Sequence, residues 1–297
     1  MVNEAVHCSQ FLCSSLRGIG ERWGASYTLG IMPLIRLNGQ EIHYVHNKID
    51  DVGPTLVLVH GAGGRIQSWP LQWQETRYVP SARGKRWITD FPIYIVDLPG
   101  HGRSPLPGRT SIADYAADII ALTEVTDIKQ AVIAGHSMGG AVAQQVALAQ
   151  PSNLSAIILM GSGAYMPVTD LILDGLLTDF PATVNLITKF SWHKEAADVF
   201  TAVARQHMLD TDPRVIHGDF YACNNFDFRG RLAEITVPAL VIGGDTDKMM
   251  PLANSQFLAD HIPYGQLVVI ANAGHYMMIE KTASVSNAIV QFLRDLF

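Results

Sequence analysis

The sequence predicts an α/β fold in which a doubly wound, mostly parallel sheet carries an inserted helical segment. Short runs rich in aliphatic and β-branched residues recur along the 297 residues, and helical patterns separate them. These runs are apolar on both faces, which is typical of strands that helices cover on two sides. From residue 163 to about residue 231 the alternation stops, and helical periodicity takes its place. Together these observations favour a parallel sheet with a helical insertion.

The expected strands are separated by helices, as parallel neighbours require. They cover residues 55–60, 93–96, 132–134, 156–160, 237–242 and 266–270. Ahead of them, alternating segments on both sides of Asn38-Gly39 predict a β-hairpin, because Asn-Gly favours the tight turn between antiparallel strands. Ser111 predicts a helix start with Asp114 in the first turn, and a closing helix is expected over residues 282–296.

The chain is long enough to bury a sizeable core. We expect an α/β core formed by residues 32–162 and 232–297, with residues 163–231 as a helical cap over one edge of the sheet. Residues 1–31 differ from the rest of the chain, because Ser, Arg and Gly interrupt their apolar stretches. They also lack the basic start that is typical of a signal peptide. We therefore interpret residues 1–31 as a poorly ordered extension.

Composition argues against several classes of partner. A net charge of −6 without a long basic run argues against nucleic acid, and no apolar run reaches the ~20 residues of a membrane-spanning helix. Three cysteines cannot form a disulfide framework, which favours a reducing, cytoplasmic setting. No metal-ligand cluster or nucleotide motif stands out, so neither a metal nor a cofactor is implied, and nothing specifies an oligomeric state. His43 and His46 are expected to face opposite sides of one strand, which argues against a shared metal.

The motif Gly-His-Ser-Met-Gly at residues 135–139 is the strongest candidate for chemistry. It lies between a buried strand and an Ala-rich helix that Pro151 is expected to end, which is the strand–turn–helix setting of a nucleophilic serine. The turn is so tight that side chains at Gly135 and Gly139 would collide with neighbouring backbone. Ser137 is expected to adopt a strained conformation and to point out of the sheet edge toward a substrate.

A serine hydroxyl becomes a strong nucleophile only when a base takes its proton, and a carboxylate orients that base. His275 follows the last expected strand, and Asp245 and Asp247 both follow the strand before it. Parallel strands end on one edge of the sheet, so these groups can converge with Ser137. The Gly-rich loop at residues 60–64 follows another strand, and its backbone N–H groups suit a developing negative charge.

Taken together, these motifs resemble those of the α/β-hydrolase family over residues 32–297. The nucleophile, the acid and the base also occur in the chain order Ser, Asp, His that the family uses. The matching segments are residues 60–64, 97–104, 135–139, 244–251 and 274–275. The resemblance implies an α/β-hydrolase fold with a helical cap. A serine nucleophile argues against the family's dehalogenases and epoxide hydrolases, for which the resemblance would imply aspartate.

The resemblance also implies roles for single residues. Ser137 would be the nucleophile, and His275 the base and then the acid. Asp247 is preferred over Asp245 as the orienting carboxylate, because the family pattern G-x-x-D-x-x-x-P fits residues 244–251.

The family pattern implies supporting roles as well. The backbone N–H groups of Ala62 and Met138 would form the oxyanion hole, and Asp97 would anchor its own turn. Three histidines lie in family motifs and are expected to fix loops rather than to transfer protons: His60, His101 and His136.

The predicted function is hydrolysis of carboxylic esters of small, largely apolar molecules through an acyl-enzyme. The same three groups also suit carbon–carbon bond hydrolysis, amide or lactone opening, acyl transfer, or a cofactor-free perhydrolase reaction in which peroxide replaces water. An alternative from another class is a small-molecule receptor that keeps the fold and its pocket but turns over slowly or not at all.

Overall fold

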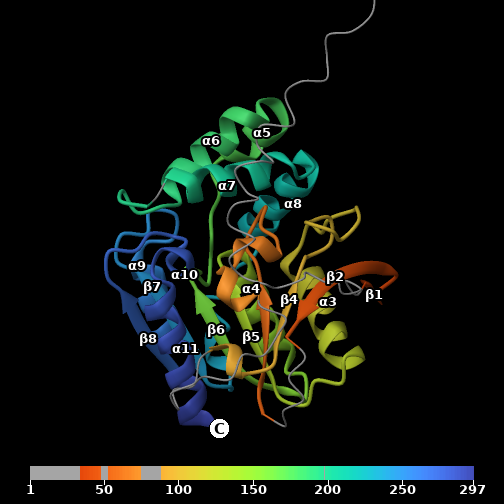
Figure 1. Cartoon of the computed structure of the whole chain (residues 1–297), viewed down its shortest axis with the longest axis vertical. Helices are drawn as coiled ribbons and strands as arrows, with labels where there is room; N and C mark the ends of the chain where they lie inside the picture. The colour runs from red at the N-terminus through yellow and green to blue at the C-terminus, as the bar shows by residue number, and fades with distance from the viewer. Residues whose placement is uncertain (1–33, 48–52, 75–87, 197) are drawn as a thin grey trace, which may run out of the picture. The chain divides into compact units, whose positions relative to one another are not determined.

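A β-sheet of eight strands organises the part of the chain that the computed structural model describes, which is residues 34–47, 53–74, 88–196 and 198–297 (Figure 1). Its strand order is β1-β2-β4-β3-β5-β6-β7-β8. The strands are β1 (Leu34–Leu37), β2 (Gln40–His46), β3 (Thr55–Val59), β4 (Ile93–Val96), β5 (Ala131–His136), β6 (Leu154–Met160), β7 (Ala239–Gly244) and β8 (Gly265–Ile270). The extension expected at residues 1–31 lies outside the described residues.

The sheet is parallel from β4 to β8 along this order, and antiparallel only where β2 pairs with β1 and β4. This confirms the predicted mostly parallel sheet. The hairpin at Asn38-Gly39 is also confirmed, and both turn residues have positive φ, 47° and 85°. A two-residue hairpin turn of this type needs positive φ at both positions, which Asn and Gly tolerate best.

Helices lie in connections between the parallel strands, and two more follow the last strand, β8. They are α3 (Ile112–Val125), α4 (Met138–Ala149), α5 (Asp170–Thr178), α6 (Phe180–Phe190), α7 (Asp198–Leu209), α8 (Pro213–Asn224), α9 (Leu252–His261), α10 (Met277–Glu280) and α11 (Thr282–Leu296). The Ser111 side chain caps α3 by accepting a hydrogen bond from the Asp114 N–H at 3.1 Å, as predicted. No helix among the described residues has the length and apolar character needed to cross a bilayer.

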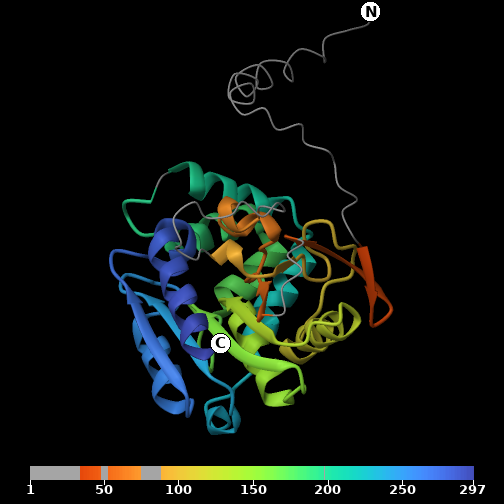
Figure 2. The ribbon, with the colours of Figure 1, turned by 60° about the horizontal axis from the view of Figure 1, so that its bottom comes forward.

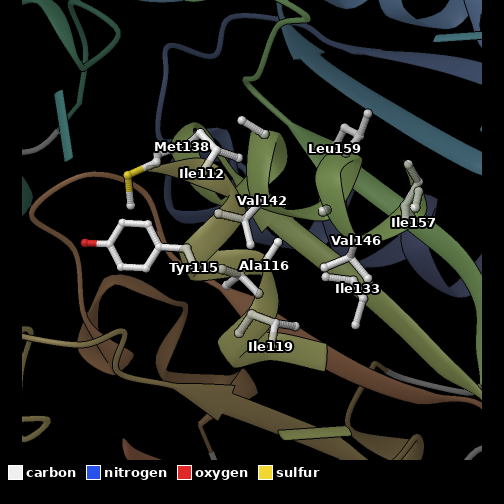
Figure 3. Packing of buried hydrophobic residues seen from close by; sticks show 14 of the residues in the cluster. Ile112, Tyr115, Ala116, Ile119, Ile133, Met138, Val142, Val146, Ile157 and Leu159 are labelled. Carbon is white, nitrogen blue, oxygen red and sulfur yellow. The ribbon is translucent and has the colours of Figure 1, made fainter. Parts of the chain in front are cut away.

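The sheet buries both of its faces, and helices lie on either side of it (Figure 2). In β3 the alternate residues Val57 and Val59 join one apolar cluster, while Leu56 and Leu58 join the other. Figure 3 shows the first cluster, in which side chains of α3 pack against those of α4 and β5. Each aliphatic side chain buried in this way contributes ~1.5–3 kcal/mol of transfer free energy. The two-sided burial explains why these strands read as continuous apolar runs.

Helices α5 to α8 form a separate group between β6 and β7 (Figure 1). They share a small apolar cluster that includes Leu176, Val184 and Ile216. This group lies against the ends of the parallel strands, because Met208 and Ile216 contact the loop after β3 near Gly63. Residues that the chain inserts between β6 and β7 therefore lie against the loop at the carboxyl end of β3.

The close packing of α4 against β5 and β3 predicts that one methyl group added at Gly135 strongly destabilises the fold. A Cβ at Gly135 would overlap the backbone of Gly139, so Gly135→Ala is expected to lower the free energy of unfolding by about 3 kcal/mol or more. Gly230 has open space around it, and Gly230→Ala should change the free energy by less than ~0.5 kcal/mol. Urea unfolding of both variants measures the difference. Equal stability of the two would contradict the steric role of the turn.

Candidate active site

The backbone turn at residues 135–139 presents Ser137 between the end of β5 and the start of α4. Ser137 has φ 54° and ψ −118°, which is the strained conformation expected for it. A Cβ at Gly139 would overlap the carbonyl of Val59, and one at Gly135 would overlap Gly139 itself. The two glycines therefore allow α4 to turn back directly against β3 and β5. This close approach is what forces the serine out of the sheet edge.

His275 and Asp247 form a buried pair on the two loops that follow β8 and β7. The Nδ1–H of His275 donates to Asp247 Oδ2 at 2.8 Å, because an ionised carboxylate only accepts. The other oxygen of Asp247 accepts from the N–H groups of Met249 and Met250, at 2.8 and 2.9 Å. Asp245 is exposed and instead lies 3.4 Å from the N–H of Ala273. The hydrogen bond through Nδ1 leaves Nε2 of His275 free to accept a proton.

Ser137 and His275 line one cavity, and Ala62 lies in its wall. Within the described residues, Ser137 Oγ makes no hydrogen bond to the imidazole, and such contacts in free enzymes are often long until substrate binds. The remaining lining is mostly apolar and includes four methionines, whose flexible thioethers adapt to varied shapes. No Lys or Arg is among the residues that line it. The apolar members are Met166, Pro167, Val168, Ile187, Met208, Phe220, Cys223, Met249, Met250 and Tyr276.

Hydrogen bonds to the backbone of the His275 loop hold it in place. The N–H of His275 donates to the Ser191 carbonyl at the end of α6, at 3.0 Å, and the Nε2–H of His136 donates to the His275 carbonyl at 2.9 Å. The Glu280 carboxylate accepts from the N–H of Gly274 at 2.9 Å. Sequence reasoning did not find Ser191 or Glu280. For Glu280 the available signal was an acid a few residues after the candidate base.

The loop after β3 brings backbone N–H groups to the serine. A Cβ at Gly61 would lie 3.0 Å from the Cβ of Ser137, so this loop passes directly beside the candidate nucleophile. The N–H of Ala62 has no hydrogen-bond acceptor within the described part of the chain. Met138 is the first residue of α4, and helix geometry leaves the N–H groups of the first turn without an intrahelical partner. Both N–H groups are therefore available to a ligand.

Asp97 organises the neighbouring loop, as the sequence suggested. Its carboxylate accepts from His43 Nδ1 at 2.7 Å and from the N–H groups of Ile66 and Arg103 at 2.8 and 3.0 Å. Burial alone would raise the pKa of Asp97, but these hydrogen bonds hold it below its usual value. His46 stacks instead on Tyr94, with ring centroids 5.1 Å apart. The two strand histidines thus belong to different environments.

His60 is held as a neutral imidazole beneath this loop. Its Nδ1–H donates to the Gly61 carbonyl at 2.8 Å, and its Nε2 accepts from the N–H of Leu98 at 3.0 Å. Burial and the nearby His101 lower the pKa of His60 to about 4. At neutral pH the uncharged ring therefore links two loops, and its one N–H is used in the hydrogen bond to Gly61.

The lowered pKa of His60 predicts a pH dependence of stability. The unfolded chain binds a proton here below about pH 6.5, whereas the folded protein does so only near 4. The contribution of neutral His60 to the free energy of unfolding is therefore complete above pH 6.5. It is lost as the pH falls, by about 2 kcal/mol at pH 5. Compared with wild type, His60→Gln should show a correspondingly smaller fall in unfolding free energy between pH 7.5 and 5. Urea unfolding at a series of pH values measures both slopes, and identical slopes would contradict the neutral assignment.

Comparison with known proteins agrees with this fold. The sequence profile of the Alpha/beta hydrolase family matches residues 56–288, and the chain belongs to this family. A pimeloyl-acyl-carrier protein methyl ester esterase from Yersinia pseudotuberculosis is 30% identical over 258 residues, which cover 81% of this chain and 93% of that protein. A 2-hydroxy-6-oxononadienedioate/2-hydroxy-6-oxononatrienedioate hydrolase from Pseudomonas putida is 28% identical, with 86% and 92% coverage. The solved structure of a thermophilic esterase is similar with a TM-score of 0.75 and 29% identity, covering 89% and 97% of the two chains.

Proposed function

We propose that this protein is a serine hydrolase that cleaves carboxylic esters of small, largely apolar molecules. The observation that carries the proposal is the hydrogen bond between His275 and Asp247 at the wall of the cavity that Ser137 enters. The esterases among its relatives support ester hydrolysis as the reaction class. We further propose residues 163–231 as a cap on a core formed by residues 32–162 and 232–297.

The proposed reaction proceeds in two stages. Nε2 of His275 takes the proton of Ser137 as Oγ attacks the ester carbonyl, and Asp247 stabilises the imidazolium that forms. The alcohol leaves with the proton from His275, and an acyl-enzyme remains. His275 then takes a proton from water, whose oxygen attacks the acyl group. The bond between Ser137 Oγ and the acyl group breaks, Oγ takes the proton back from His275, and the acid leaves.

The oxyanion that forms in each stage is assigned to the N–H groups of Ala62 and Met138. Both are backbone groups fixed by the fold, so they need no reorganisation when charge develops. Each such donor lowers the barrier by ~3 kcal/mol, which is a few hundredfold in rate.

The lining of the cavity supports a neutral acyl group. A buried carboxylate is costly without a cationic partner, and neither Lys nor Arg lies among the lining residues. The relative from Pseudomonas putida is described as acting on a dienedioate, which carries two carboxylates. The uncharged lining therefore favours an ester of an apolar acid over carbon–carbon cleavage of such a dianion. We expect the enzyme to act in the cytoplasm on a small molecule and without a cofactor.

A panel of p-nitrophenyl esters tests the function. Wild type should hydrolyse the butyrate faster than the hemisuccinate, because the second carboxylate of the hemisuccinate would enter an uncharged cavity. Ser137→Ala should lose at least ~10³-fold of this activity. A fluorophosphonate probe should label wild type at Ser137 and leave the variant unlabelled. Saturable binding of a hydrophobic ligand without turnover would favour a receptor, and labelling that survives in the variant would remove Ser137 as nucleophile.

Replacement of the two aspartates after β7 tests the choice of carboxylate. Asp247→Asn should lower kcat by ~10⁴-fold, because the amide no longer fixes the tautomer of His275. Asp245→Asn is the matched control and should stay within about threefold of wild type, since Asp245 is exposed and does not contact the imidazole. Steady-state kinetics on one ester compares them. A larger loss in the Asp245 variant would reverse the assignment.

A further inference from the structure

A buried carboxylate from α8 contacts the loop that carries the proposed oxyanion donor. Asp219 has no exposed surface, and its Oδ2 accepts a hydrogen bond from the N–H of Gly63 at 2.9 Å. Gly63 follows Ala62 directly and has a φ of +63°. The peptide that joins Ala62 to Gly63 is therefore fixed at its N–H end by an acid that lies 156 residues later in the chain.

Two further groups donate hydrogen bonds to this carboxylate. The Tyr115 hydroxyl donates to Asp219 Oδ1 at 2.6 Å, and His101 Nε2 donates to Oδ2 at 2.8 Å. The other ring nitrogen of His101 lies 3.0 Å from the carbonyl of Pro99. Both nitrogens thus face acceptors, which is the arrangement of a charged imidazolium.

The charge state of His101 agrees with this geometry. Burial pushes the pKa of His101 down, but the charge and hydrogen bond of Asp219, together with the Pro99 carbonyl, raise it above its ordinary value. The carboxylate and imidazolium then neutralise each other. This matters because an uncompensated negative charge at Asp219 would oppose an oxyanion forming nearby.

Docking of α8 does not depend on this carboxylate alone. A Cβ at Gly218 would lie 2.8 Å from the Arg109 carbonyl, and one at Gly108 would lie 2.9 Å from the Val215 side chain. The helix is therefore already packed closely against the loop before α3. A buried ion pair contributes little to stability relative to apolar packing, so attachment of the helix does not by itself explain Asp219.

We propose that Asp219 is a positioning residue. By holding the N–H of Gly63, it restrains the backbone on the C-terminal side of Ala62, so that the Ala62 N–H, which lies in the preceding Gly61–Ala62 peptide, faces the reacting carbonyl. This inference rests on the proposed ester hydrolysis at Ser137. Asp219 touches neither the substrate nor Ser137, and acts only through the Gly63 N–H. Its effect should appear where the oxyanion is stabilised, and not where the neutral ester is bound.

The isosteric variant Asp219→Asn tests the proposal. Without the negative charge, buried His101 becomes neutral and presents a lone pair at Nε2, to which the new amide NH₂ donates. The same NH₂ then faces the Gly63 N–H, which loses its acceptor. We expect kcat to fall ~30-fold with KM within about twofold. The affinity for a butylboronic acid, which forms a tetrahedral adduct with Ser137, should fall in parallel with kcat.

Tyr115→Phe is the matched control, because it removes a hydrogen bond from the other carboxylate oxygen and leaves the Gly63 contact intact. It should keep kcat within about threefold of wild type. Hydrogen exchange of the Gly63 amide should accelerate in Asp219→Asn and not in Tyr115→Phe, a readout that needs no activity. Asp219→Ala should repeat the kinetic pattern of the Asn variant.

The outcomes separate this inference from the proposed function. If wild type lacks esterase activity or Ser137→Ala retains it, the proposed function fails. If wild type is active and Asp219→Asn matches it in kcat and boronic acid affinity, only the role of Asp219 is overturned. An equal loss of kcat in Asp219→Asn and Tyr115→Phe, with boronic acid affinity unchanged, would also overturn the positioning role of Asp219. Asp219 would then have only a structural role.

Discussion

The steric limit at Gly135 and Gly139 is the constraint on which the rest of this site depends. Because neither position has room for a Cβ, α4 leaves β5 at once and Ser137 takes a backbone conformation that an unconstrained residue avoids. Such strain persists only where surrounding packing fixes it. Here that packing is the apolar core on both faces of β3, β5 and β6. The stability of the sheet therefore keeps the Ser137 hydroxyl at the cavity.

Sequence reasoning succeeded where local backbone chemistry determines the structure. The Asn38-Gly39 hairpin, the Ser111 cap and the helix over residues 282–296 all occur as predicted. These features depend on a few adjacent residues, whose conformational preferences can be read directly. The positive φ of Ser137 could also be expected, because the two glycines of its motif are near neighbours in the sequence, although the packing that maintains it involves the distant strand β3.

Sequence reasoning was incomplete where contacts join distant segments. Asp245 and Asp247 follow the same strand, and spacing alone did not separate them before the family pattern was considered; in the structure the imidazole of His275 contacts Asp247. Their catalytic roles stay a proposal. Neither Ser191 nor Asp219 belongs to a motif. Ser191 acts through its backbone carbonyl, which every residue has, and Asp219 is a single acid on a helix. Only tertiary structure brings them to the loops they hold.

The backbone hydrogen bond between Ser191 and His275 limits which helical inserts this fold can accept. Segments that shape a pocket are natural targets for exchange between relatives, and α5 to α8 form one continuous insert of this kind between β6 and β7. Yet a carbonyl at the end of α6 is one of the groups that hold the loop of His275. Any residue at position 191 supplies that backbone carbonyl, whereas the position of the carbonyl in space depends on where α6 ends. A transplanted insert must therefore reproduce the length and exit of that helix before its new specificity can be expressed.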